Sequence, residues 1–80
     1  MPSQKPSPIK SRSRFGRNVA ALRAARGLTQ ENTAETIGVS ARYFQSVEAG
    51  EYFPSFLTLL RLQQVLHCEW NDLFNGCEPE

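Results

Sequence analysis

The chain has 80 residues, a mass of 9.0 kDa and a formal net charge of +1, and its length predicts one small domain. Its 40% hydrophobic and 21% charged residues are typical of a globular protein and argue against a disordered or fibrous one. No apolar run approaches the roughly 18 residues that a membrane span needs, and the N-terminus lacks the apolar core of a signal peptide. We therefore expect a cytoplasmic protein without membrane contact. A domain of this size leaves little room for an enclosed active site, which disfavours an enzyme.

Residues 1–13 are rich in Pro, Ser, Lys and Arg and contain one large aliphatic residue after Met1. Such a segment buries too little surface to offset the entropy of ordering it, so we expect a flexible basic arm. Residues 1–30 contain seven Lys or Arg and no acid, whereas residues 31–80 contain two Arg and eight acids. This asymmetry indicates an anionic partner at one end of the chain, although a solvated basic tail explains the same charges.

Helical periodicity begins at Phe15. Phe15, Val19 and Leu22 are spaced to lie on one face of a first helix. Gly27 supplies the left-handed residue that ends this helix.

Four further helices follow in the sequence. Three of them come after residues that accept a hydrogen bond at a helix N-terminus, namely Thr29, Ser40 and Ser55. A short last helix is predicted around residues 70–74. No segment alternates with a period of two residues for long enough to form a strand, so the predicted fold class is all-α. We expect the domain to cover residues 14–76 and to be followed by a short tail at 77–80.

Residues 30–47 have the spacing of a helix-turn-helix unit. Two helices that cross steeply need a small residue near the crossing and a turn residue that adopts a positive φ. Ala34 and Gly38, four residues apart, meet these needs. The second helix of the unit must then bury two residues one turn apart, and Phe44 and Val47 have this separation.

This region and its flanks resemble the lambda-repressor-like helix-turn-helix family, the Cro/repressor type of DNA-binding domain. The segments that carry the resemblance are LRAARGLTQE, AETIGVS, VEAGEYFPS and TLLRL, in the family's order and separations. The resemblance covers residues 15–74 and implies a compact fold of five helices. It also implies a sequence-specific regulator of transcription, such as a repressor, that inserts its third helix into the major groove of double-stranded DNA. We expect it to act as a homodimer on a two-fold symmetric operator.

The third helix is expected to present polar side chains opposite its apolar pair. The residues on or beside this outward side are Ala41, Arg42, Tyr43, Gln45 and Ser46, preceded by the capping Ser40. In the family, this side enters the major groove and contacts DNA. Arg42 is the best candidate reader, because its planar fork can bond O6 and N7 of guanine together. A solvated surface arginine is the alternative.

The resemblance also assigns roles outside the third helix. Gln30 matches a position whose side chain and helix N-terminus meet a DNA phosphate. Arg23 and Glu48 match an internal ion pair that ties the first helix to the end of the third, with two independent surface charges as the alternative. Related repressors reach DNA with a flexible N-terminal segment. We therefore expect phosphate or minor-groove contacts from the basic residues in and next to the arm, with a solubilising tail as the alternative; these residues are Lys5, Lys10, Arg12 and Arg14.

The chain departs from the family pattern in several places. At the end of the fourth helix, His67 replaces the usual Gly and Cys68 a common Val, and we expect a C-capping His and a small apolar Cys. Thr33 stands where Leu is usual, so we expect a looser site or one filled by a neighbour such as Phe44. The loop after Gly50 carries Glu51 where Lys or Arg is usual, which weakens the expected grip on phosphate. Aromatic residues in and beyond this loop are candidate dimer contacts, with packing inside one subunit as the alternative; they are Tyr52, Phe53, Trp70 and Phe74.

His67, Cys68 and Cys77 match no standard zinc pattern, so we expect no metal site. The sequence also indicates no cofactor, no catalytic constellation and no small-molecule effector. The partner that the resemblance implies is double-stranded DNA of the nucleoid. A protein-interaction module on the same fold, such as an adaptor or an antitoxin, is the second hypothesis, and the acidic loop and the aromatic residues favour it.

Overall fold

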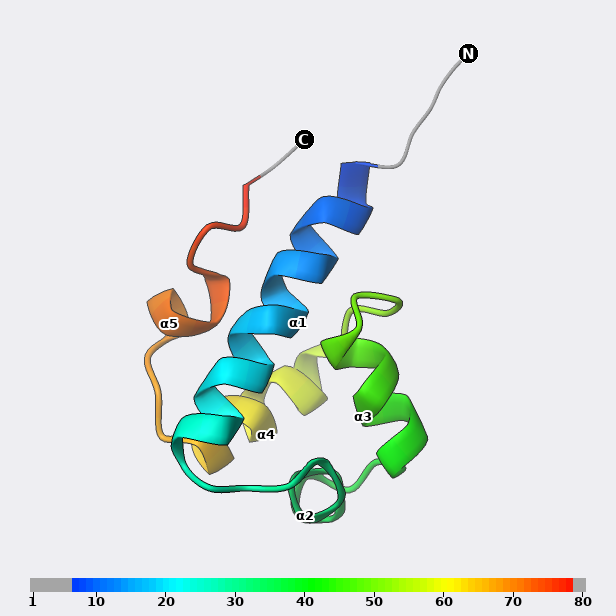
Figure 1. Cartoon of the computed structure of the whole chain (residues 1–80), viewed down its shortest axis with the longest axis vertical. Helices are drawn as coiled ribbons and strands as arrows, with labels where there is room; N and C mark the ends of the chain where they lie inside the picture. The colour runs from blue at the N-terminus through cyan, green and yellow to red at the C-terminus, as the bar shows by residue number, and fades with distance from the viewer. Residues whose placement is uncertain (1–6, 79–80) are drawn as a thin grey trace.

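The computed structural model describes residues 7–78, which contain five α-helices (Figure 1). The helices are α1 (Ser7–Ala25), α2 (Gln30–Ile37), α3 (Ala41–Glu48), α4 (Phe56–Leu66) and α5 (Trp70–Phe74). No strand occurs in this range, which confirms the prediction of an all-α fold with five helices. None of the helices described is both long enough and apolar enough to cross a membrane.

The N-termini of α2, α3 and α4 are capped as the sequence predicts. The hydroxyl oxygens of Thr29, Ser40 and Ser55 each accept a hydrogen bond from the backbone N–H three residues ahead. At its other end, α4 stops at His67, which has a left-handed φ of 49°. This conformation costs a residue other than glycine about 1–2 kcal/mol. Arg26 Nη2 donates a hydrogen bond to the His67 carbonyl oxygen at 3.0 Å and so helps to hold the turn.

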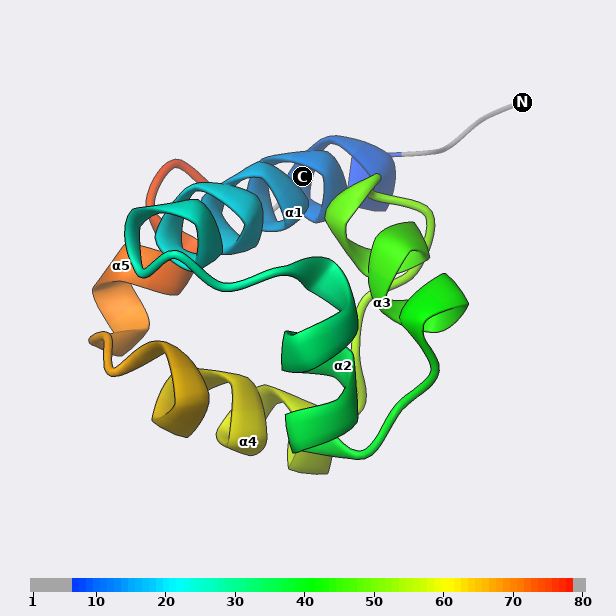
Figure 2. The same cartoon turned by 60° about the horizontal axis from the view of Figure 1, so that its bottom comes forward.

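One hydrophobic core joins the five helices. α1 contacts α3 and α5, while α2 contacts α3 and α4 (Figures 1 and 2). Every helix contributes to the fully buried apolar side chains, which are Phe15, Val19, Ile37, Phe44, Val47, Leu62, Leu66 and Leu73. Because α2 to α5 have at most 11 residues each, burial of these side chains supplies most of the stability of these four helices.

Two positions in the core carry a small or a polar residue because of the groups that surround them in the fold. Gly16 lies where α1 crosses the end of α3, and a Cβ there would collide with the backbone carbonyl oxygens of Val47 and Glu48. Thr33, in the place of the family's Leu, is fully buried, and its hydroxyl donates to the carbonyl oxygen of Thr29 at 2.8 Å. A buried polar group with a hydrogen-bond partner thus replaces an apolar side chain at this position.

The structure differs from the sequence prediction in residues 7–13. These residues form the first turns of α1 instead of a flexible arm, whereas residues 1–6 of the predicted arm lie outside the described range. Pro8 does not oppose this early start, because proline is tolerated in the first turn, where its missing N–H has no helical acceptor. α1 therefore begins about two turns before the position that its apolar periodicity indicates.

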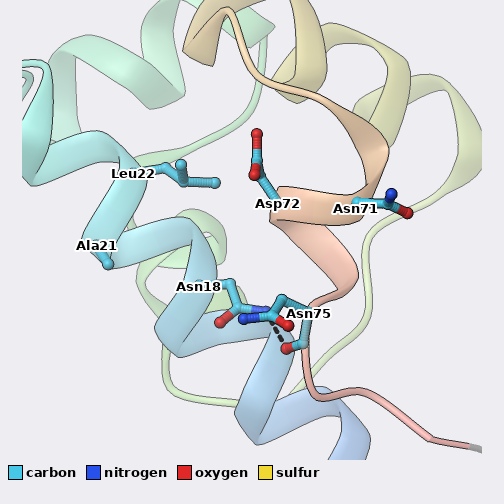
Figure 3. Close-up of a pocket in the computed structure, with 6 residues that line it drawn as sticks. All are labelled: Asn18, Ala21, Leu22, Asn71, Asp72 and Asn75. Carbon is cyan, nitrogen blue, oxygen red and sulfur yellow. Dashed lines mark hydrogen bonds between the residues drawn. The ribbon is translucent and has the colours of Figure 1, made fainter.

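The chain after α5 is held along α1 by hydrogen bonds from α1 side chains. Asn18 Nδ2 donates to the carbonyl oxygen of Asn75 at 2.9 Å, as Figure 3 shows, and Arg14 Nε donates to the same oxygen at 3.1 Å. Further along, the Ser11 hydroxyl donates to the carbonyl oxygen of Glu78 at 2.7 Å. These contacts support the first turns of α1. The last two residues of the predicted tail lie outside the described range.

Candidate nucleic-acid interface

α2 and α3 form a helix-turn-helix unit with the predicted geometry. Ala34 is fully buried, and Gly38 ends α2 with a left-handed φ of 81°. The turn is closed by a hydrogen bond from the Val39 N–H to the Ala34 carbonyl oxygen at 3.0 Å. Phe44 and Val47 are fully buried on the inner side of α3. The helix-turn-helix that the residue spacing predicts is therefore confirmed. α3 lies at the edge of the molecule, and its other side is free of neighbouring helices (Figure 2).

The outward side of α3 is polar and accessible. Arg42 and Gln45 are exposed, while Ala41 and Ser46 are half-buried. A shallow open depression runs along this side and is lined by Arg42, Gln45, Ser46, Ala49 and Glu51. The fold thus brings three of the predicted reading residues into one stripe. It adds Glu51, which the sequence pattern presents only as a source of repulsion.

Arg23 and Glu48 form the predicted ion pair between α1 and the end of α3. Arg23 Nε donates to Glu48 Oε2 at 2.7 Å, and its Nη2 donates to Oε1 at 3.2 Å. The hydrogen bond to Glu48 raises the pKa of Arg23 above its ordinary value, whereas partial burial opposes this shift. Arg23 Nη1 also donates to the carbonyl oxygen of Leu28 at 2.8 Å, so the guanidinium joins three segments.

Gln30 belongs to the same network. Its Nε2 donates to Glu48 Oε1 at 2.7 Å, which holds the first side chain of α2 against the end of α3. At the start of α3, the Ser40 hydroxyl is occupied by the backbone N–H of Tyr43 at 3.0 Å. Both side chains therefore have a defined place at the helix N-termini that border the outward side of α3.

Two tyrosines border the other edge of this side. Tyr43 is half-buried on α3, and its ring stacks with that of Tyr52 in the loop after α3, with centroids 6.2 Å apart and planes at 22°. Tyr52 is 56% exposed. The ring of Tyr52 thus packs on α3, whereas the other aromatic residues that the sequence groups as candidate dimer contacts pack with one another.

Those other aromatic residues form a row across the molecule, which we call the aromatic row: Phe53, Phe74 and Trp70. Phe53 lies 6.4 Å from Phe74 and also packs on the buried Phe15 at 4.9 Å, while Phe74 lies 6.3 Å from Trp70. Phe53 and Trp70 nevertheless remain partly exposed.

α4 adds exposed apolar side chains that the sequence interpretation missed. Phe56 is 73% exposed, and Leu57 and Leu60 are exposed as well. The sequence contains a signal for this surface. Phe56 and Leu60 are one helical turn apart and lie on a different side of α4 from the buried residues Leu59, Leu62 and Leu66. We refer to Phe56, Leu57 and Leu60 as the α4 face.

Three of the basic residues predicted to reach DNA, Lys10, Arg12 and Arg14, lie in the N-terminal half of α1, whereas Lys5 lies outside the described residues. Lys10 is exposed and Arg12 is half-buried, with an Nε atom that has no hydrogen-bond partner in the described part of the chain. Arg14 holds the C-terminal segment through Asn75. The turns that carry these residues lie next to the loop after α3, because a Cβ on Gly50 would come within 2.6 Å of the Ser13 hydroxyl.

A second depression lies between α1 and α5 (Figure 3). Two of its polar side chains, those of Asn18 and Asp72, already have structural partners. Asn18 holds the chain after α5, and Asp72 accepts a hydrogen bond from the backbone N–H of Glu69 at 3.0 Å to cap α5. The depression therefore reflects how α5 is attached to α1.

Cys68 and Cys77 are free thiols. Burial raises the pKa of both thiols above the ordinary value, which disfavours the thiolate form that binds metals or attacks electrophiles. Among residues 7–78, no group of three or more His, Cys, Asp or Glu side chains is arranged to hold a metal ion.

The chain is similar in sequence to helix-turn-helix proteins. A family model described as a helix-turn-helix domain matches residues 14–71. An uncharacterized HTH-type transcriptional regulator of Bacillus subtilis is 36% identical over 56 residues, which span 70% of this chain and 85% of the relative. Another, from Sinorhizobium fredii, is 42% identical over 55 residues, which span 69% of this chain and 71% of the relative.

Solved structures give the same result. The restriction-modification controller protein C.AhdI from Aeromonas hydrophila has a TM-score of 0.72 at 35% identity, with 78% of this chain and 94% of that chain covered. The clp gene regulator ClgR from Corynebacterium glutamicum has a TM-score of 0.75 at 26% identity, with 88% and 71% covered. The chain belongs to the lambda-repressor-like helix-turn-helix family of DNA-binding transcriptional regulators.

Proposed function

We propose that this chain regulates transcription by binding double-stranded DNA sequence-specifically, with α3 in the major groove and two copies on a two-fold symmetric operator. The observation that carries the proposal is the stripe of Arg42, Gln45 and Ser46 on the outward side of a helix whose inner side is buried. Readout of base edges requires such donors and acceptors on a rigidly held element. This activity takes place on nucleoid DNA in the cytoplasm and needs no cofactor and no catalytic step.

The side chains of the stripe have distinct partners on the base edges. Arg42 donates to O6 and N7 of a guanine, and Gln45 pairs with N6 and N7 of an adenine. Ser46 is a short donor or acceptor that tolerates several bases. Ala41 contacts the methyl group of a thymine. One bidentate pair contributes about 1–3 kcal/mol of discrimination against the wrong base.

DNA phosphates bind on both sides of the stripe. On one side, the free N–H groups at the start of α2 attract a phosphate, and Gln30 is held beside them by Glu48. Ser40, at the opposite end of α3 from Glu48, marks a second helix N-terminus that attracts a phosphate. On the other side, the hydroxyls of the stacked Tyr43 and Tyr52 supply neutral donors.

The first turns of α1 supply positive charge that the loop after α3 lacks. Lys10 and Arg12 carry this charge on a helix that lies against the loop at Gly50. Arg14 adds to the local positive potential, although its Nε is taken by Asn75. Each phosphate neutralised by these residues strengthens binding to all sequences and makes it salt-dependent.

A homodimer forms through the aromatic row and the α4 face. One short helix reads only a few base pairs, so two half-sites are needed for useful specificity. Exposed apolar clusters of this kind mark interaction sites on small proteins, because monomers rarely leave several large apolar side chains in water. Tyr52, which stacks on α3, contributes to the DNA side and not to the dimer.

Selection of bound duplexes from a random DNA pool at near-physiological salt tests the proposal, with the full chain and the double variant Arg42→Ala/Gln45→Ala as the matched control. We expect a two-fold symmetric consensus for the parent chain and loss of several consensus positions for the variant. Enrichment of no sequence by the parent chain contradicts the proposal.

A protein-interaction module is the second candidate function. The observations that favour it are the acidic Glu51 in the loop and the exposed α4 face. It predicts capture of a protein partner by the α4 face together with no selected DNA consensus. The same selection experiment therefore separates the two candidates.

A further inference from the structure

We propose that Glu51 is a base-reading residue, whose carboxylate accepts a hydrogen bond from the N4 amino group of a cytosine in the major groove. The proposal rests on the proposed function, because it needs α3 in that groove. It assigns a specificity-determining role to the residue that replaces a basic one in the family pattern.

The first argument is the position of the side chain. Glu51 lines the same depression as Arg42, Gln45, Ser46 and Ala49, so it lies beside the side chains that read bases in the proposed function. Ala49, with only a methyl group, leaves the depression open between them. From Arg42 to Ala49 the helix rises roughly 10 Å at 1.5 Å per residue. This distance corresponds to about three base-pair steps of 3.4 Å.

The second argument is that the backbone of Glu51 is held on both sides. Its N–H donates to the carbonyl oxygen of Ser46 at 2.9 Å. Gly50 before it has a left-handed φ of 83° and lies so close to Ser13 that a side chain at this position would collide with it. Tyr52 after it is stacked on α3. The carboxylate therefore projects from a supported turn, as preorganised recognition requires.

The third argument is chemical. Among the described residues, no salt bridge or side-chain hydrogen bond engages the Glu51 carboxylate, which is exposed and acceptor-only when ionised. Base edges in the major groove offer two donors, N4 of cytosine and N6 of adenine. Adenine places the acceptor N7 next to its donor, and this atom repels a carboxylate. Cytosine has no such acceptor on its own edge, so it is the preferred partner.

The experiment is duplex selection with the full chain, Glu51→Ala, Glu51→Gln and the control Glu35→Ala. Glu35 is an exposed acid on α2 that does not line the depression. Its replacement by alanine therefore changes the net charge by the same amount as Glu51→Ala without altering the depression. We expect the parent consensus to contain a cytosine about three base pairs from the guanine read by Arg42. Glu51→Ala should lower the preference for this cytosine about tenfold. Glu51→Gln should shift the base preference at this position toward adenine, because a glutamine amide pairs with N6 and N7 of adenine.

Two results overturn the assignment while leaving the proposed function intact. In the first, Glu51→Ala keeps the parent consensus and binds all duplexes more tightly, as Glu35→Ala does, which means that Glu51 only repels phosphate. In the second, Glu51→Ala changes neither consensus nor affinity. If the parent chain itself selects no consensus, the proposed function fails and the assignment fails with it.

Discussion

Arg23 on α1 and Glu48 at the end of α3 meet in an ion pair with Nε and Oε2 2.7 Å apart, and Glu48 also holds Gln30 at the start of α2. One carboxylate therefore connects the three helices that set the orientation of the outward side of α3. The side chain of Glu48 is 6% exposed and that of Arg23 is 17% exposed, so the pair is largely shielded from water. Its hydrogen bonds satisfy both oxygens of the carboxylate.

Arg23→Ala is expected to lower the free energy of unfolding by about 3 kcal/mol, because it leaves a buried carboxylate without its charged partner. Urea denaturation followed by circular dichroism measures this change. The control is Arg17→Ala, which removes an exposed arginine from the same helix and should change stability by less than about 0.5 kcal/mol.

The double variant Arg23→Met/Glu48→Leu sharpens the interpretation. Replacing a buried ion pair by apolar side chains of similar size is often nearly neutral, so most of the stability that Arg23→Ala removes should return. If Arg23→Ala lowers the free energy of unfolding by less than about 0.5 kcal/mol, the two charges act independently, as exposed charges do.

Arg42→Ala is expected to weaken operator binding by about 1–3 kcal/mol and to relax preference at one base position, because the variant cannot form the bidentate pair with guanine. Duplex selection and fluorescence anisotropy measure the two effects. The charge-matched control is Arg26→Ala, in the turn just after α1, which should leave the consensus unchanged. If Arg42→Ala keeps both the consensus and the affinity of the parent chain, Arg42 is not a reader.

Local chemistry explains why much of the fold is predictable from the sequence. Thr29, Ser40 and Ser55 cap helices through their own neighbours, so the residue type alone indicates the helix start. Gly38 is required by a positive φ in the turn of the helix-turn-helix unit. The ion pair of Arg23 follows from the family resemblance, because no local pattern links residues 25 positions apart.

The features that escape sequence reasoning depend on contacts between distant segments. The helical start of α1 is supported by Ser11 and Glu78, which are 67 positions apart. Gly16 looks unfavourable inside a helix until the structure shows the carbonyl oxygens of α3 beside it. Likewise, Glu51 is assigned to the outward side of α3 only when the turn at Gly50 is known. Periodicity within one element contains none of this information.

The double variant Lys10→Gln/Arg12→Gln is expected to weaken binding to all duplexes equally and to flatten its salt dependence. Removing one charge that neutralises a phosphate reduces the slope of log K against log salt concentration by about 0.9. Titrations at several salt concentrations measure the slope, and circular dichroism checks that α1 is retained. Arg26→Gln serves as the control for a basic residue outside the interface. An unchanged slope in the double variant would mean that these residues are a solvated surface.

Phe56→Ser and Leu60→Ser are each expected to raise the dimer dissociation constant at least about tenfold, which corresponds to about 1.4 kcal/mol. Both side chains lie on the α4 face and are exposed, so their replacement weakens the interface without opening the core. Sedimentation equilibrium over a range of concentrations measures the change, and urea denaturation confirms that each variant folds.

Tyr52→Ser is the matched control for the dimer, because it removes an exposed aromatic ring that stacks on Tyr43 beside α3. It should leave the dimer dissociation constant unchanged and lower DNA affinity on all sequences. The reverse pattern, with Tyr52→Ser monomeric and Leu60→Ser dimeric, would move the interface to the loop after α3. Disrupting the dimer should also reduce binding to a full operator more than binding to an isolated half-site, because only the full operator engages two outward sides of α3 at once.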